Sequence, residues 1–350
     1  MPGVLAFQEP SPFRCADMAS NWQSGSVVLD RPAIRNYLGF HRLCAAFAAL
    51  QVALLALTAA AMLYTGLRLD WQDLVSLRTA AVALMWIGWA LHVVMPGRRP
   101  REWVIAETFL VIALLVTFSN IGSPLQYAII AFRAPLADVW LAKADALLGV
   151  NVPLLVTWTA AQPGLASVLA AVYGSLLPQF VLPPLVLGCW YRDRQALWEY
   201  AWNFQVCLSA ALVGLALFPA ACAFTYYGFH SLLDQTRFTS QFEAVRSGVM
   251  SVVPLNDMEG MITFPSFHVA GGLLITWSFR RYPVWAVTLG LVNVVLIAST
   301  VLTGAHYVVD VIAALGVFGC SVWLWRRVAA NWIEPNPAHG TVELREELAA

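Results

Sequence analysis

Two short segments of the chain each place a histidine among residues that can assist it in chemistry. The first is Phe264-Pro265-Ser266-Phe267-His268, and the second runs from Thr303 to Asp310 and contains His306. An imidazole exchanges protons near neutral pH and is also a nucleophile. Two such rings and one carboxylate are suited to nucleophilic attack on a phosphate ester.

The spacing of His306 and Asp310 indicates that the two side chains act together. They are four residues apart on a helix that we expect over residues 305–325, so they share one helix face. The Asp310 carboxylate then bonds one imidazole nitrogen and fixes the tautomer, which leaves the other nitrogen free to attack.

The first segment has the pattern of a helix start. Ser266 follows a proline and is the expected N-cap, which places His268 in the first turn. Backbone N–H groups are free there and the helix dipole favours an anion. The sequence therefore predicts a phosphate site beside His268.

The composition indicates that the solvent around most of the chain is lipid. Of the 350 residues, 60% are hydrophobic and 11% are charged, against about a quarter charged in soluble domains. The formal net charge is zero and no cluster of basic residues is interleaved with aromatics, so nucleic acid is not an expected partner.

Uninterrupted apolar stretches of about 20 residues, the length that crosses a bilayer, predict an all-α integral membrane protein. We expect a bundle of about eight transmembrane helices. They are placed at residues 43–67, 77–96, 103–122, 164–190, 197–222, 266–280, 283–303 and 305–325. No cleavable signal peptide is recognised in the first 42 residues.

These spans bring both histidines to one membrane boundary. The chain leaves His268, crosses to Arg280 and Arg281, and returns from Pro283 to the level of His306. Ionisable side chains at membrane depth are costly and are usually functional. The convergence of three of them favours a catalytic site.

The basic residues orient the bundle, because Lys and Arg accumulate on cytoplasmic loops. Fourteen of the twenty fall on the side that holds both termini. We therefore expect cytoplasmic termini and a site on the non-cytoplasmic face of the cell (inner) membrane. Two long connections lie on that face, at 123–163 and 223–265, and within the first an amphipathic helix is predicted at the interface over 133–150.

The sequence resembles the type 2 phosphatidic acid phosphatase superfamily. That family carries a Pro-Ser-x-His segment, which matches Pro265 to His268, and a Ser-Arg-x5-His-x3-Asp segment, which matches Ser299 to Asp310. The Gly-x-His-Tyr-x-x-Asp-Val sequence is most similar to the branch that contains inositol phosphorylceramide synthases and other inositolphosphotransferase-like proteins. Three further segments resemble the same branch more weakly: Pro135 to Asp138, Tyr173 to Gln179 and Arg246 to Gly248.

The resemblance implies a six-helix catalytic core and a mechanism without metal or cofactor. His306 attacks phosphorus, Asp310 orients it, and His268 protonates the leaving oxygen. A phosphohistidine forms, and water or a lipid alcohol then accepts the phosphoryl group. The implied partners are membrane lipids: a phospholipid donor and that acceptor.

The chain departs from the family pattern in its cations. The Lys-x6-Arg-Pro segment is absent, and Thr300 stands where the family has arginine. A site short of positive charge suits a phosphodiester better than a phosphomonoester, which carries nearly two charges. Arg246 is the expected replacement phosphate ligand, with Arg133 as the second candidate.

Each of these residues also has a plainer interpretation. The histidines and Asp310 can form a structural polar network or a two-histidine, one-carboxylate metal site. Arg246 can be a loop arginine that reaches the interface. Tyr173 and Gln179 are candidates for lining the substrate pocket, and the pair Ser175 and Gln179 also suits hydrogen bonding between helices.

The sequence thus predicts four regions: a cytoplasmic segment (1–42), an added transmembrane hairpin (43–102), a catalytic membrane domain (103–330) and a cytoplasmic tail (331–350). The function we expect is transfer of a phospho-headgroup between lipids. A lipid phosphate phosphatase is the alternative, and an inactive scaffold or lipid transporter is the second alternative.

The predicted orientation can be tested directly. A reporter fused after Ala350 should be cytoplasmic, because the basic residues concentrate on the side of the termini. Paired fusions of alkaline phosphatase and a fluorescent protein report the location. Alkaline phosphatase activity at this position would invert the whole topology.

Overall fold

The computed structural model describes residues 31–70, 73, 77–94, 100–229, 235–329 and 332. Most of the predicted cytoplasmic tail and most of the predicted N-terminal segment lie outside these residues. The described chain is mostly helical. In order, the elements are α2 (Arg31–Thr65), β1 (Arg68–Leu69), α4 (Leu77–Val94), α5 (Pro100–Ala131), α6 (Asp138–Leu147), α7 (Val152–Ala160), α8 (Pro163–Gly174), α9 (Leu176–Gln179), η1 (Pro184–Trp190), α10 (Arg194–Leu217), α11 (Ala223–Tyr227), α12 (Thr236–Ser247), β2 (Val252–Val253), η2 (Leu255–Asp257), α13 (Phe267–Ser278), α14 (Pro283–Leu302), α15 (Val308–Leu324) and η3 (Trp325–Ala329).

Five described helices are long and apolar enough to cross a membrane, and seven if each of two bent pairs forms one span. These features identify a multi-pass membrane protein. Every predicted span coincides with a helix or bent helix, although α13 has only 12 residues. The predicted fourth span is α8, α9 and η1, bent by 44°. The count of eight stays a prediction.

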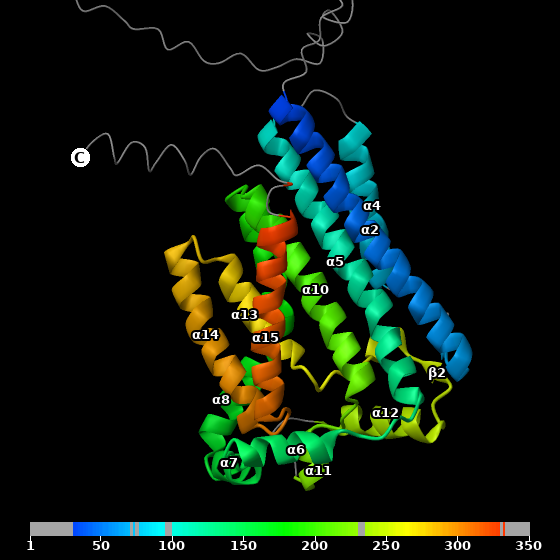
Figure 1. Ribbon diagram of the computed structural model, residues 1–350, viewed down its shortest axis with the longest axis vertical. Helices are drawn as coiled ribbons and strands as arrows, with labels where there is room; N and C mark the ends of the chain where they lie inside the picture. The colour runs from blue at the N-terminus through cyan, green and yellow to red at the C-terminus, as the bar shows by residue number, and fades with distance from the viewer. Residues whose placement is uncertain are drawn as a thin grey trace, which may run out of the picture.

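The long helices stand side by side, and short helices lie across one end of them (Figure 1). In the bundle α5 packs on α2, α4 and α10, while α10 also packs on α13 and α15, and α14 packs on α13 and α8. The short helices α6, α7, α11 and α12 lie at the end remote from the start of α2, which we call the lower end. Helix α6 lies within residues 133–150, where a helix is predicted, and its position at the interface stays a prediction.

Two buried carboxylates of the long helices are paired with arginine, which offsets the cost of a lone charge at low dielectric. Glu107 on α5 bonds Arg194 at 2.7 Å and accepts from the Trp198 indole at 2.8 Å. Glu199 on α10 bonds Arg280 at 2.8 Å. These pairs tie α10 to the helices on either side.

A two-residue parallel pairing of β1 with β2 was not predicted from the sequence. Arg68 pairs with Val252 and Leu69 with Val253. The strands are too short for an alternating pattern to be recognised. Their pairing attaches the chain after α12 to the end of α2 at the lower end.

Gly214 allows the segment that leads to His268 to lie directly on α10. A Cβ at this position would clash with the Pro265 ring and lie 2.6 Å from the Phe264 carbonyl oxygen. Only glycine permits so close an approach of two backbones. The position of the histidine segment therefore depends on this residue.

We predict that Gly214→Ala destabilises the protein by about 1–3 kcal/mol through overpacking. Gly316→Ala on α15 is the matched control, because no described residue lies within 4 Å of an added Cβ there. Thermal unfolding of the purified proteins in detergent measures both effects. Equal unfolding temperatures for the two variants would contradict this account of α10 packing.

Candidate active site

The two histidines of the sequence motifs meet at the lower end of the bundle. The centroids of the His268 and His306 rings are 6.0 Å apart, with the planes inclined at 55°. His306 is 2% exposed, whereas His268 is only partly buried. Two rings at this separation can flank a single phosphoryl group.

The tautomer of His306 follows from its hydrogen bonds. Its Nδ1 lies 2.9 Å from the Thr263 carbonyl oxygen and 3.3 Å from Asp310 Oδ2. A carbonyl oxygen only accepts, so Nδ1 carries the proton and donates it. Nε2 of the neutral ring then holds a lone pair.

The structure corrects the expected helical pairing of His306 and Asp310. Helix α15 begins at Val308, so His306 lies in the preceding turn. This turn starts at Gly304, whose φ of +80° is the left-handed conformation that ends many helices. The two side chains still meet because Asp310 Oδ2 also accepts from the Tyr307 N–H at 2.9 Å. The nearer partner of the imidazole is Thr263, which sequence reasoning missed.

Two carboxylates from α6 hold the start of α15. Asp145 accepts from the Val308 and Val309 N–H groups at 2.9 and 2.8 Å. Asp138 accepts from the Tyr307 hydroxyl at 2.9 Å and from the Ala221 N–H at 2.9 Å. Both are buried, and the Asp145 carboxylate faces the positive end of the α15 dipole. We call this set of bonds the α6 clamp.

The α6 clamp was only partly visible in the sequence. Asp138 belongs to a segment that resembles the family weakly, whereas none of the motifs contains Asp145. The two residues are seven apart, which is two helical turns, so they share one face of the predicted interface helix. That spacing of acidic residues on an apolar helix was the available signal.

The start of α13 agrees with the sequence prediction. Ser266 is the N-cap, and its hydroxyl accepts from the Val269 N–H at 3.3 Å. The Ser266 N–H donates to the Asp310 carbonyl oxygen at 3.3 Å, which joins the two motifs through the backbone. His268 therefore lies in the first turn, where unpaired N–H groups favour an anion.

Tyr173 lies against His268, as expected for a residue lining the pocket. The rings stack at 4.1 Å with an angle of 17°, and the Tyr173 hydroxyl lies 3.4 Å from His268 Nδ1. Gln179 does not reach the histidines: its amide nitrogen bonds Ser175 at 2.9 Å within the same segment, not between helices.

Neither candidate arginine contacts a histidine within the described residues. Arg246 donates to the Ala134 carbonyl oxygen at 3.1 Å and lines a neighbouring cavity. Arg133 is exposed and donates to the Ser247 carbonyl oxygen at 3.2 Å. Thr300 bonds the Ile297 carbonyl oxygen at 2.7 Å in the position where the family has arginine.

Among the described residues, no three His, Cys, Asp or Glu side chains are placed to hold a metal ion. The groups that the site presents include two imidazoles, a carboxylate and helix-terminus amides.

The fold and site define a helical membrane protein with paired imidazoles at one end of the bundle. The sequence model of the PAP2 superfamily matches residues 139–324, from α6 to the end of α15. The chain belongs to this superfamily. No curated protein and no solved structure matched in the corresponding searches.

The α6 clamp yields a prediction for Asp145→Asn. An amide keeps one acceptor and turns a donor group toward an N–H, so we expect a loss of about 1–3 kcal/mol in unfolding free energy. Asp257→Asn is the control, since the exposed ion pair of Asp257 with Arg237 is worth about 1 kcal/mol or less. Thermal unfolding in detergent compares them. An Asp145→Asn protein as stable as the control would show that the clamp does not stabilise α15.

Proposed function

We propose that this protein is a membrane-embedded enzyme that transfers a phospho-headgroup between lipids, of the inositol phosphorylceramide synthase type. Membership of the PAP2 superfamily indicates phosphoesterase or phosphotransferase activity. The observation that carries the proposal is the free Nε2 of His306, with the second imidazole 6.0 Å away between ring centroids.

In the proposed reaction, His306 Nε2 attacks phosphorus and a nitrogen–phosphorus bond forms. The bond from phosphorus to the leaving lipid oxygen breaks, and His268 gives that oxygen a proton. A hydroxyl of the acceptor then returns a proton to His268 and attacks phosphorus. The nitrogen–phosphorus bond breaks, and both histidines regain their first state.

The identity of the donor follows from charge. Within the described residues no arginine or lysine forms an ion pair or hydrogen bond at the two histidines. Helix-terminus amides are then the main positive groups near the phosphate. A singly charged phosphodiester suits this site better than a doubly charged monoester. A lipid phosphatase, with water as the acceptor, is the alternative.

The proposed site lies at the lower end, opposite the start of α2 (Figure 1). With cytoplasmic termini, this end faces away from the cytoplasm, at the outer boundary of the cell membrane. Membrane lipids are then both donor and acceptor. A scaffold or transporter without catalysis is the remaining alternative from a different class.

We predict that His306→Ala lowers product formation by about a thousandfold or more, and that His268→Ala lowers it by about a hundredfold or more. Purified protein supplied with a phosphodiester lipid and a lipid alcohol, followed by chromatography of the lipids, measures this. Cys320→Ala, exposed on α15, is the matched control. If no phosphorus-containing product forms, and His306→Ala has no effect in cells, the results would favour an inactive scaffold.

The diester preference is tested separately by comparing phosphatidate with a phosphodiester donor at equal surface concentration. Phosphatidate turnover should be the slower, because the described site offers no cation for its second charge. Release of inorganic phosphate and formation of a new phospholipid are measured side by side. Equal or faster turnover of phosphatidate would replace the transferase proposal with the phosphatase.

A further inference from the structure

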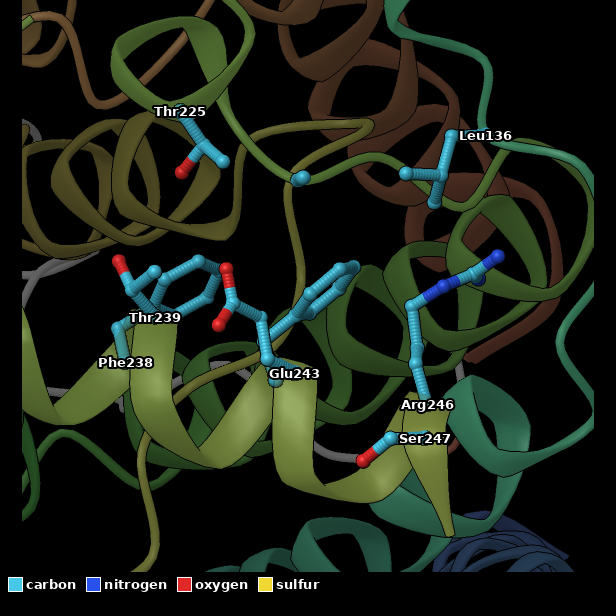
Figure 2. A pocket seen from close by; sticks show the side chains of 9 residues that line it. Leu136, Thr225, Phe238, Thr239, Glu243, Arg246 and Ser247 are labelled. Carbon is cyan, nitrogen blue, oxygen red and sulfur yellow. The ribbon is translucent and has the colours of Figure 1, made fainter. Parts of the chain in front are cut away.

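A cavity lies close to the proposed catalytic site, and the proposed reaction does not use it. It has a volume of about 360 Å³ and is formed by α12, α11 and the segment before α6. In Figure 2, side chains of α12 approach it from one side, and Leu136 and Thr225 approach it from the other. This volume is in the range of small-ligand sites.

The cavity adjoins the α6 clamp. Ala221 lines it, and the Ala221 N–H bonds Asp138, which in turn accepts from the hydroxyl of Tyr307. Tyr307 follows His306 in the chain. A ligand in the cavity would thus lie at the same end of the bundle as the histidines but in a separate place.

The floor of the cavity is apolar. Phe238 and Phe242 are 7% and 3% exposed, and their rings stack with centroids 5.6 Å apart. Leu136 and Ala221 complete this surface. Such a floor accepts the glycerol and acyl part of a lipid rather than a small hydrophilic ion.

The rim carries one positive and one negative side chain that do not pair. Arg246 and Glu243 are three apart on α12, yet no ion pair forms between them in the described structure. Arg246 donates one hydrogen bond, to Ala134, and its guanidinium lies 5.9 Å from the centre of the Phe242 ring. No other hydrogen bond joins the guanidinium to a described residue, and bidentate binding of phosphate is typical of arginine.

Hydroxyl groups accompany the carboxylate. Thr225 and Thr239 line the cavity with Glu243, and the buried hydroxyl oxygen of Thr225 has no partner within the described part of the chain. A carboxylate and hydroxyl oxygens accept hydrogen bonds from a primary ammonium. In Figure 2 the Glu243 carboxylate borders the cavity on the side of Thr239 and the Arg246 guanidinium borders it on the side of Leu136. One ligand that carries both an anion and a primary ammonium can therefore address both groups.

We propose that this cavity binds the headgroup of a zwitterionic phospholipid with a primary amine, with its phosphate on Arg246 and its ammonium on Glu243. The phosphate expected on Arg246 is therefore that of a bound lipid, not the phosphate under attack at His306. The proposal does not depend on the proposed catalysis, because a lipid can occupy the cavity in an inactive protein.

The test is lipid binding by the purified full chain in detergent, measured by native mass spectrometry. The probes are phosphatidylethanolamine, phosphatidylcholine and phosphatidylglycerol with identical acyl chains. We expect phosphatidylethanolamine to bind about tenfold more tightly than the other two, as charge-assisted hydrogen bonds allow. Equal binding of the three lipids would overturn the proposal.

Variants assign the preference to the two rim residues. Arg246→Gln should lower the affinity for phosphatidylethanolamine about tenfold. Glu243→Gln, a conservative change at an exposed position, should remove the preference for phosphatidylethanolamine over phosphatidylglycerol. Arg237→Gln is the matched control on α12: Arg237 pairs with Asp257 and Glu259, away from the cavity lining, so binding should not change. An unchanged preference in Glu243→Gln would refute the ammonium assignment.

Two further measurements distinguish a whole lipid from its free headgroup, and binding in the cavity from binding at the histidines. Glycerophosphoethanolamine, which lacks acyl chains, should bind more weakly than the lipid, and equal affinity would refute a lipid occupant. His306→Ala should retain the preference for phosphatidylethanolamine. Loss of that preference in His306→Ala would place the lipid at the histidines and overturn the separate site, whereas loss of activity alone concerns only the proposed function.

Discussion

The site depends on the hydrogen bond from His306 Nδ1 to the Thr263 carbonyl oxygen, at 2.9 Å. It joins the turn before α15 to the segment before α13, and it sets which nitrogen of the ring carries the proton. The backbone bond from Ser266 to Asp310 ties the same two segments together. Without these contacts the two imidazoles would share a membrane depth but have no fixed relation to each other.

The surrounding structure keeps this bond in place. Three buried carboxylates, Asp138, Asp145 and Asp310, accept from the first backbone N–H groups of α15 or from Tyr307. Asp145 and Asp310 bond backbone N–H groups at the positive end of the helix, where an acid is favourable. Because α6 supplies two of them, a short helix at the lower end positions a histidine at the end of a long one. Gly214 fixes the other histidine segment by letting it lie on α10.

The sequence predicted the helices, the meeting of His268 with His306, the N-cap role of Ser266 and the placement of Tyr173. These predictions follow from the length of the apolar stretches, from the direction in which successive spans cross the membrane, and from local capping. All three can be read along the chain without knowing which distant residues meet. The superfamily expected from the two motifs was confirmed by the match over residues 139–324. The inositolphosphotransferase-like branch stays a proposal.

What the sequence did not predict involves contacts between distant segments. The Thr263 carbonyl is a backbone group, so no residue type marks its role. Asp145 meets Val308 and Val309 across 163 and 164 positions of the chain. Arg246 was expected at the phosphate from its place before the Pro-Ser-Phe-His segment. In the structure α12 places its guanidinium beside Phe242 and the neighbouring cavity. Charge and chain order indicate that an arginine lies near the phosphate site, but the packing of the helices decides which groups that arginine contacts.

The central claim is that His306 is the nucleophile, and the direct test is to trap the covalent intermediate. Rapid quenching in alkali during turnover of a phosphodiester donor, followed by peptide mass spectrometry, locates any phosphorus bound to protein. The account predicts an adduct on the peptide that contains His306, still carrying the headgroup, and none in His306→Ala. Product formation with no adduct, or with the adduct on another residue, would contradict it.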